Sequence, residues 1–351
     1  MAKPALNAAF DYQNAKPMAL PLSSRAPKTV LEALRDAVSP TQLFGFPGFS
    51  PGAVGTGKQR PIQLAPAKTI LPATSGDGLT PEEFGTSSIP YTTSQVNASG
   101  DYTAQYYPFR AVGKLLFYIG ASQSMCSASL IKNGIVVTAA HCVIKYGSGS
   151  GWYSNWTFVP AYNNGTAPYG SWTVNHARAV NTYINGNDAC SNPGVVCQND
   201  VAILVLNPNS KGQYPGPNTG YLGYGMNGYS YNSAGQALIT QLGYPAALDG
   251  GVLMERNDSM GMTQASMAGN TVIGSLMTGG SSGGPWVVNL GTAPSLSGTS
   301  FGSFPSRNFA VGVTSWGSTS DAVKQMGASP FTSNNIGNLI NAECATSHPW
   351  C

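Results

Sequence analysis

A histidine, an aspartate and a serine stand in contexts that suit nucleophilic catalysis. His141 ends the string Thr-Ala-Ala-His, Asp200 heads the apolar run 201–206, and Ser282 lies in the glycine-rich string 280–285. A serine hydroxyl holds its proton near neutral pH, so it needs an imidazole to remove that proton and a buried carboxylate to fix the tautomer of the imidazole. We therefore predict Ser282 as nucleophile, His141 as general base and Asp200 as the residue that orients His141.

Each of these positions also has an alternative role. His141 could be a satisfied core histidine, Asp200 could cap the start of a strand, and Ser281 is a rival nucleophile. Asp188 and Asp249 are alternative acids, but both lie in loops with no apolar strand attached.

Chain order argues against two other hydrolase classes. The string 280–285 also matches the Gly-x-Ser-x-Gly turn of α/β-hydrolases, whose histidine must follow the serine. Of the three histidines, His141 and His176 precede the string, and only His348 follows it, near the end of the chain. The sequence has no His-Glu-x-x-His arrangement, which excludes a zinc peptidase of that type. We expect no metal and no organic cofactor.

The surroundings of His141 predict a β-hairpin. Asn133-Gly134 is expected at its tip, where a positive φ costs little, and the β-branched run 135–137 leads directly to the histidine. A bond between Cys126 and Cys142 would hold this hairpin beside the base.

The six cysteines form three local pairs along the chain. Six cysteines allow 15 connectivities, so proximity alone does not fix the bonds. An even count in close pairs nevertheless indicates an oxidising compartment, and the short spacing typical of zinc sites is missing. The predicted pairs are Cys126 with Cys142, Cys190 with Cys197, and Cys344 with Cys351.

Composition excludes several classes of function. Only 9% of the 351 residues are charged, and the net charge is +3. The basic residues are scattered along the chain, so no basic face for nucleic acid is expected. No run of about eighteen apolar residues could span a membrane. The sequence as given shows no signal peptide at its start, yet its glycine-rich, poorly charged composition is typical of a secreted or periplasmic all-β protein. We expect a monomer.

Residues 1–105 differ from the rest of the chain. Pro, Ala, Ser and Thr dominate, and periodicity predicts one helix over 27–38, with Val30, Leu31, Leu34 and Val38 on one face. The stretches 45–57 and 75–99 are expected to be loops. This segment is either a propeptide that is removed or an extension that wraps the catalytic body.

Short strands with turn-rich connections follow, which predicts a barrel or a sandwich. Strands are expected near 109–119, 135–137, 200–206, 236–243, 285–288 and 309–316, and a short helix over 335–344 with Ile336, Leu339 and Ile340 facing inward.

The order of His141, Asp200 and Ser282, in these contexts, resembles the chymotrypsin-like serine peptidases over residues 107–343. The strings 243–246 and 277–286 look like the glutamyl-endopeptidase-like branch. The resemblance implies two six-stranded antiparallel β-barrels, with the three residues in the cleft between them. It also implies a catalytic domain over 106–343, a disulfide-closed tail over 344–351 and synthesis as an inactive precursor, for which a propeptide is the favoured interpretation of residues 1–105.

The resemblance also assigns the binding groups. The backbone N–H groups of Gly280 and Ser282 would hold the oxyanion of the tetrahedral intermediate. The substrate-binding residues would be Leu276, Met277, Thr278, Gly279, Thr314, Ser315, Trp316 and Gly317. Trp316 could instead be a plain core residue.

Three departures from the family pattern matter. Ser281 replaces the aspartate that in trypsin-type enzymes pairs with a newly freed N-terminus, so activation should depend on uncovering the cleft. Leu276 cannot supply a carboxylate for Arg or Lys, and Thr314 and Met277 stand where glutamate-specific members have a histidine and a hydroxyl residue. An apolar or small pocket is expected.

The function predicted from the sequence is therefore a secreted serine endopeptidase that acts on proteins or peptides. Two alternatives remain open: a catalytically silent binding protein on the same fold, and an esterase that uses the same site.

Overall fold

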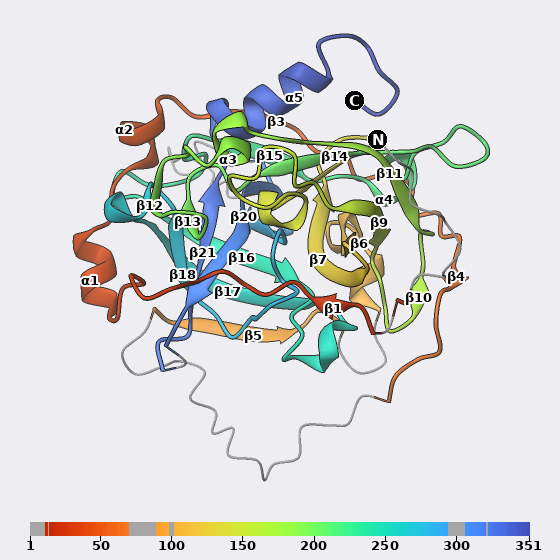
Figure 1. Cartoon of the computed structure of the whole chain (residues 1–351), viewed down its shortest axis with the longest axis horizontal. Coiled ribbons are helices and arrows are strands. Elements are labelled where there is room, and N and C mark those ends of the chain that lie inside the picture. The colour runs from red at the N-terminus through yellow and green to blue at the C-terminus, as the bar shows by residue number, and fades with distance from the viewer. Residues whose placement is uncertain (1–10, 13, 70–88, 98–101, 294–305, 321) are drawn as a thin grey trace.

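The structure is a computed structural model that describes residues 11–12, 14–69, 89–97, 102–293, 306–320 and 322–351. Most of its regular structure is strand, arranged as two closed six-stranded antiparallel β-barrels, which confirms the predicted fold class (Figure 1). No helix within the described ranges is long and apolar enough to cross a membrane.

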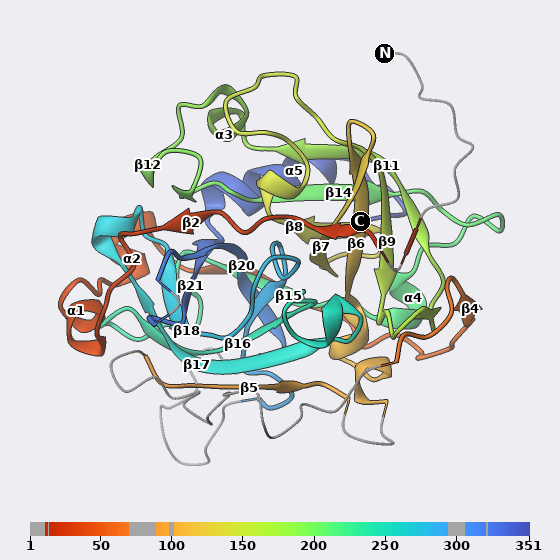
Figure 2. The same cartoon turned by 60° about the horizontal axis from the view of Figure 1, so that its bottom comes forward.

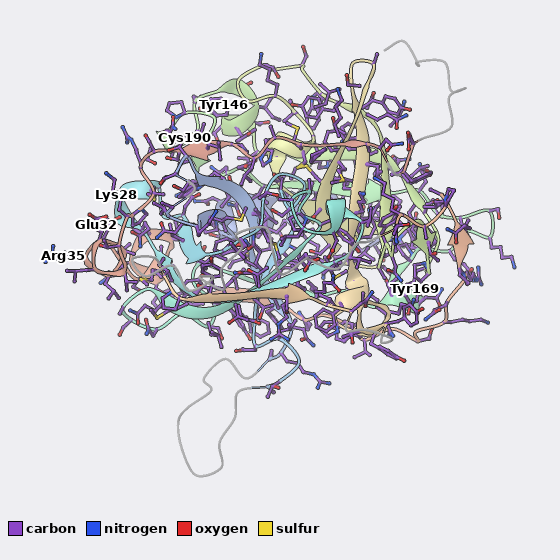
Figure 3. The ribbon with its side chains drawn as sticks, turned by 90° about the horizontal axis from the view of Figure 1, so that it is seen from below. Lys28, Glu32, Arg35, Tyr146, Tyr169 and Cys190 are labelled. Atoms are coloured by element: carbon purple, nitrogen blue, oxygen red, sulfur yellow. A yellow bond between two sulfur atoms is a disulfide. The ribbon has the colours of Figure 1, made fainter. Side chains whose placement is uncertain are left out.

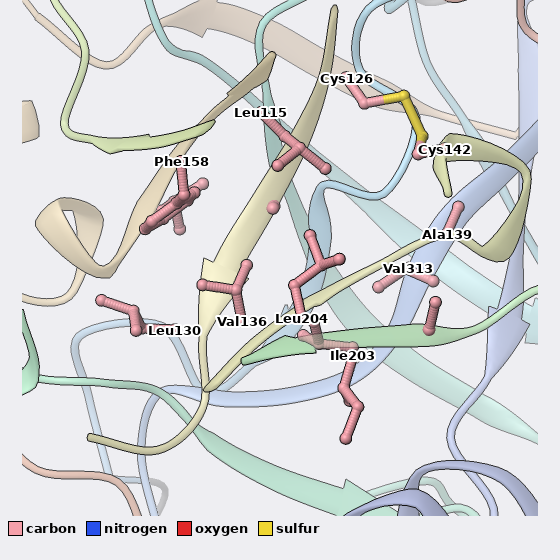
Figure 4. Close-up of a cluster of buried hydrophobic side chains, with 14 of the residues drawn as sticks. Leu115, Cys126, Leu130, Val136, Ala139, Cys142, Phe158, Ile203, Leu204 and Val313 are labelled. Carbon is pink, nitrogen blue, oxygen red and sulfur yellow. A yellow bond between two sulfur atoms is a disulfide. The ribbon is translucent and has the colours of Figure 1, made fainter. Parts of the chain in front are cut away.

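The first barrel is closed by the pairing of its second and third strands, and its core is filled by aliphatic and aromatic side chains from every side. Leu115, Leu130, Val136, Phe158 and Leu204 meet there and are fully buried (Figure 4). Its strands are β6 (Val112–Ile119), β7 (Ser122–Leu130), β8 (Ile135–Thr138), β9 (Ser154–Pro160), β11 (Trp172–Ala179) and β14 (Ala202–Leu206).

The second barrel is closed in the same way by the pairing of β19 with both β16 and β20. Trp286 and Trp316 are its largest fully buried side chains. Its strands are β16 (Gln236–Gly243), β17 (Glu255–Thr263), β18 (Thr271–Gly274), β19 (Pro285–Val288), β20 (Phe309–Ser318) and β21 (Gln325–Pro330), and β15 (Gly223–Met226) pairs alongside β20.

Short elements complete the catalytic region. They are β10 (Thr166–Ala167), α3 (Asn181–Asn185), β12 (Cys190–Asn192), β13 (Val196–Cys197), α4 (Gly216–Thr219) and α5 (Asn338–Glu343). The helix α5 is shorter than the predicted 335–344, because one wider turn (Ser333–Gly337) precedes it, but Ile336, Leu339 and Ile340 are buried as expected.

The predicted hairpin forms, but not with the expected turn. Residues 131–134 connect β7 to β8, and neither Asn133 nor Gly134 has a positive φ. A Cβ at Gly134 would lie 2.4 Å from the ring of Tyr214 and 2.8 Å from Trp350, so glycine is required there for close packing.

The N-terminal extension wraps both barrels, and four of its five strands lie against strands of the two barrel sheets. Its elements are β1 (Lys16–Pro17), β2 (Leu22–Ser23), α1 (Val30–Arg35), α2 (Pro40–Phe44), β3 (Gly48–Ser50), β4 (Ile62–Gln63) and β5 (Tyr91–Gln95). Two predictions were wrong here: β3 lies within 45–57 and β5 within 75–99, because their backbones find open strand edges at β15 and β17. Residues 70–88 of the second stretch lie outside the described ranges.

The predicted helix exists but is shorter, and its buried face differs. Thr29 caps it by accepting the N–H of Glu32 at 3.1 Å, and Lys28, Glu32 and Arg35 lie on the outside of the molecule (Figure 3). Leu31 and Leu34 are exposed, whereas Ala33 is fully buried. The small side chain of Ala33 thus allows α1 to pack closely against the second barrel. The prediction that Leu31 and Leu34 would form the buried face was wrong.

Candidate active site

His141 lies in a single tight turn (Ala140–Cys142) at the end of β8. The disulfide between Cys126 and Cys142 joins this turn to β7 (Figure 4). Only 6% of the histidine is exposed. Strand, turn and disulfide together fix the position of the imidazole.

Asp200 reaches His141 because of strand register. Its strand, β14, pairs with β8 so that Ala202 lies opposite Thr138, which brings the residues just before β14 and just after β8 together. The carboxylate Oδ2 lies 2.7 Å from His141 Nδ1, and Oδ1 accepts the backbone N–H of His141 at 2.8 Å. Ser315 Oγ donates to the same Oδ2 at 2.6 Å.

The pKa of Asp200 lies below its ordinary value. Burial alone would raise it, but the charge of His141 and the hydrogen bonds from His141 and Ser315 outweigh that effect. The carboxylate therefore stays ionised near neutral pH and can hold a proton on His141 Nδ1.

The turn that carries Ser282 packs against the end of β8. Gly283 has φ +77°, and a Cβ there would lie 2.0 Å from Thr138 Oγ1 and 2.8 Å from the nitrogen of Ala139. The carbonyl of Ser282 accepts the N–H of Ser127 on β7 at 2.8 Å. The serine turn directly precedes β19 of the second barrel. These contacts nevertheless hold it against the first barrel, at Thr138 and Ala139, close to His141.

Ser282 Oγ and His141 Nε2 are both buried, and neither has a hydrogen-bond partner among the described residues. Buried polar atoms without a partner are rare and call for an explanation. Here they are the two atoms that a serine mechanism uses. The rival Ser281 has a structural role instead, because its hydroxyl donates to the carbonyl of Thr278 at 2.7 Å.

The N–H of Gly280 already has an acceptor from the N-terminal extension. Gly280 has φ +95°, and its N–H donates to the carbonyl of Met18 at 3.3 Å, while its own carbonyl accepts Ser127 Oγ at 2.9 Å. A carbonyl oxygen from elsewhere in the chain thus lies where the predicted oxyanion donor points.

A cavity of about 370 Å³ lies beside this turn. Its walls include five of the eight predicted substrate-binding residues: Leu276, Met277, Thr278, Gly279 and Gly317. Leu20 of the N-terminal extension lines it as well.

The other three predicted residues have interior contacts. The hydroxyl of Thr314 accepts from Trp286 Nε1 and from Gln241 Nε2, both at 2.9 Å, and the indole N–H of Trp316 donates to Asn270 at 2.9 Å. Ser315 contacts Asp200, a role that the sequence did not suggest, because nothing in a local pattern reveals a hydroxyl brought in from the other barrel.

The loop before Asp200 has its own support. Asp188 accepts the N–H and the side-chain amide of Asn199, at 2.9 and 2.6 Å, and the bond between Cys190 and Cys197 closes the loop between them. Asp188, considered above as an alternative acid, therefore positions the residue next to Asp200. Asp249, the other alternative, accepts a hydrogen bond from Gln95 at 2.7 Å.

All three predicted cysteine pairs are disulfides, the third joining Cys344 and Cys351. Their sulfurs are consequently unavailable as ligands in the two described groups of metal-ligating residue types. Two histidines lie outside the cleft: His176 contacts Glu343 at 3.0 Å, and His348 stacks on Trp350.

With this geometry established, comparison with known proteins identifies the family. The sequence model described as Trypsin matches residues 99–335. The chain belongs to the trypsin family. One similar solved structure is protease Anisep from Arthrobacter nicotinovorans, which is 28% identical, with TM-score 0.53 over 68% of this chain and 96% of that one.

Two further solved structures are similar to this trypsin-family chain. The thermostable serine protease AL20 from an extremophilic microorganism is 23% identical, with TM-score 0.53 over 68% of this chain and 98% of that one. A Glu endopeptidase is 17% identical, with TM-score 0.49 over 75% and 100%. No curated protein sequence matches. The expected resemblance to chymotrypsin-like peptidases is confirmed, and family and fold both indicate a peptidase.

Proposed function

We propose that this chain is a secreted serine endopeptidase, made as a precursor, in which His141, Asp200 and Ser282 form the catalytic triad. The observation that carries the proposal is the carboxylate of Asp200, which contacts His141 Nδ1 at 2.7 Å and leaves Nε2 as the free nitrogen of the ring. A histidine held in this way has the tautomer that accepts a proton from a serine hydroxyl.

The residues divide the reaction into two halves. Ser282 Oγ attacks the scissile carbonyl while His141 Nε2 takes its proton, and the N–H groups of Gly280 and Ser282 bind the oxyanion. The C–N bond then breaks as His141 returns the proton to the leaving amine, which leaves an acyl ester on Ser282. Water, deprotonated by His141, hydrolyses that ester and restores the serine.

Secretion is supported by the three disulfides, which persist in oxidising compartments. The precursor form is supported by the N-terminal extension in the cleft. The substrates we propose are proteins or peptides, bound with an apolar side chain in the cavity beside Leu276 and Met277.

The test is covalent capture of the nucleophile. The purified chain is incubated for hours with a fluorescent phosphonate, and the adduct is located by mass spectrometry. Because the adduct accumulates, it registers Ser282 even if few molecules are open at any moment. We expect one adduct, on Ser282, that is lost in Ser282→Ala and strongly slowed in His141→Ala.

A peptide library, tested on the chain whose cleft is opened by Leu20→Asp, then separates peptidase from esterase. Cleavage of internal peptide bonds supports the proposal, whereas hydrolysis of simple esters alone would assign an esterase. A chain that gives no adduct and cleaves nothing would be a silent binding protein.

A further inference from the structure

Residues 16–23 cross from the first barrel to the second and follow the cleft throughout. Figures 1 and 2 show this red segment, with β1 and β2 at its ends, passing over both barrels. β1 pairs with β7 at Ser124 and Met125, and β2 pairs with β20 at Gly317 and Ser318. The segment therefore adds a strand to each barrel at the point where the two meet.

Its backbone satisfies donors on both sides of the nucleophile. The carbonyl of Met18 accepts the N–H of Gly280 at 3.3 Å, and the carbonyl of Pro21 accepts the N–H of Gly317 at 2.9 Å. The N–H of Met18 donates to the carbonyl of Met125 at 2.8 Å. The proposed oxyanion donor and the strand edge of β20 are thus both occupied by this segment.

Its side chains enter the cavity. Leu20 lines the cavity and packs against the cluster that includes Met277. Its fit is close: a Cβ at Gly317 would lie 2.6 Å from Leu20 Cδ2, and one at Gly279 would lie 2.8 Å from the carbonyl oxygen of Met18.

The direction of the segment is wrong for hydrolysis. Both of its strand pairings are parallel. In a reacting substrate, the residue whose carbonyl is in the oxyanion site also places its side chain in the specificity cavity, and the amine that leaves lies on its far side, near the histidine. Here Met18 supplies the carbonyl but Leu20 supplies the cavity side chain, two residues later. If the bond between Met18 and Ala19 were attacked, the acyl part ending at Met18 would lie along β7, and the leaving amine of Ala19 would lie on the side of the cavity. A substrate that is cleaved has the opposite arrangement, with its acyl part on the side of the cavity.

We propose that residues 16–23 are an inhibitor built into the chain, bound to the cleft in the non-productive direction and therefore not cleaved by it. This proposal rests on the proposed function and specifies its regulation. The segment occupies the cleft by β-augmentation, a mode in which main-chain hydrogen bonds supply affinity and pockets supply specificity. Activity appears when the segment leaves, and the same segment supplied as a free peptide inhibits the opened enzyme.

Only the first part of the extension needs to move. Ser24 and Arg25, directly after β2, are exposed, whereas Ala33, Ile89 and Tyr91 are buried against the second barrel. The rest of the extension thus remains part of the folded body when residues 16–23 are displaced.

The first experiment opens the cleft in the full chain with Leu20→Asp. Leu20 is partly exposed, so the variant should fold, but its carboxylate opposes burial against Met277. The matched control is Leu31→Asp, at an exposed leucine on α1 outside the cleft. We expect the rate of phosphonate labelling to rise at least about tenfold in Leu20→Asp and to stay within about twofold in Leu31→Asp. Equal rates in all three chains would overturn the proposal.

The second experiment supplies a synthetic peptide of residues 14–25 to the Leu20→Asp chain. We expect competitive inhibition, with the peptide recovered intact by mass spectrometry, and no inhibition by the same peptide carrying Leu20→Asp. Cleavage of the peptide within residues 18–21 would show productive binding and contradict the reversed direction.

The third measurement separates this proposal from the proposed function. A fluorescent form of the peptide is titrated into the inactive Leu20→Asp/Ser282→Ala chain, and binding is read by anisotropy. Binding supports the inhibitor site whether or not the enzyme is active, and absence of binding refutes it. Failure of every chain to react with phosphonate would instead refute the peptidase.

Discussion

The hydroxyl of Ser315 donates to Oδ2 of Asp200 at 2.6 Å, and Oδ2 is the same oxygen that contacts His141. Ser315 belongs to β20 of the second barrel, whereas Asp200 and His141 belong to the first. The acid of the proposed triad is thus held by side chains from both barrels, so that a shift of one barrel against the other would change the orientation of the imidazole.

Ser315→Ala should reduce kcat by about 10- to 100-fold and leave KM within about twofold. The change removes one hydrogen bond to a charged group, worth about 1.5–3 kcal/mol, that orients His141 without touching substrate. Steady-state kinetics on the Leu20→Asp chain provides the measurement. Ser259→Ala is the control, since that buried hydroxyl donates to the carbonyl of Pro90 at 2.8 Å and not to the triad. Equal losses of kcat in the two variants would mean that Ser315 acts only on the fold.

Asp200→Asn should lower kcat by about 10⁴-fold. An amide presents an N–H toward His141 Nδ1 and so favours the tautomer with its proton on Nε2, which cannot accept from Ser282. The loss should shrink at high pH, where serine deprotonates more readily without its base. An unchanged kcat would exclude Asp200 as the acid of the triad.

Gly280→Ala should lower kcat by about 10²–10³-fold through loss of the oxyanion donor's position. Its φ of +95° and a Cβ 2.6 Å from the carbonyl of Tyr244 would both force the turn to move. Gly120→Ala is the control. Gly120 also has a positive φ, of +59°, but a Cβ added there would contact no other atom within 4 Å. Kinetics and thermal unfolding of both variants separate the two effects, because only Gly280→Ala should lose activity.

Glu255→Gln should stabilise the protein above neutral pH. Burial, with a smaller contribution from contact with Asp249, raises the pKa of this carboxyl from 4.5 to about 9. The folded state therefore keeps a proton that the unfolded state releases above pH 4.5, so the stability this proton confers is full below pH 4.5 and is lost as the pH rises toward 9. Since glutamine does not titrate, the variant should match the parent near pH 4 and exceed it by more than about 1 kcal/mol near pH 8, as measured by urea unfolding.

Glu343→Gln is the control, because its effect on the free energy of unfolding near pH 8 should have the opposite sign to that of Glu255→Gln. Burial would raise the pKa of Glu343, but hydrogen bonds and charge from His176 and Arg178 lower it below 4.5. Its contribution is present above pH 4.5 and lost as the pH falls through the lower folded value. This variant should be less stable than the parent near pH 8. If both substitutions changed the free energy of unfolding near pH 8 in the same direction, the two carboxyls would not have the environments described.

Much of the catalytic region was predictable from local pattern. The apolar run 285–288 became a fully buried strand with those bounds, and the mixed segment 236–243 also became a strand with the predicted bounds. Paired cysteines close in sequence became disulfides, and the contexts of His141 and Asp200 brought those two residues together.

The extension was less predictable, because its strands contain little apolar periodicity. β2 and β5 exist because β20 and β17 offer free edges, and an edge is a property of the folded barrel rather than of residues 22–23 or 91–95. For the same reason the contact between Met18 and Gly280 had no signal in the sequence: a backbone carbonyl looks alike at every position. Whether the extension is removed on maturation stays a prediction.

The most direct test of the central claim is amide hydrolysis by the Leu20→Asp chain compared with the same chain carrying Ser282→Ala. A quenched fluorescent peptide with an internal leucine serves as substrate, and the products are identified by mass spectrometry. The account predicts cleavage of an internal peptide bond that falls by at least about 10⁴-fold when the hydroxyl is removed. Equal hydrolysis by the two chains would contradict a serine mechanism at residue 282.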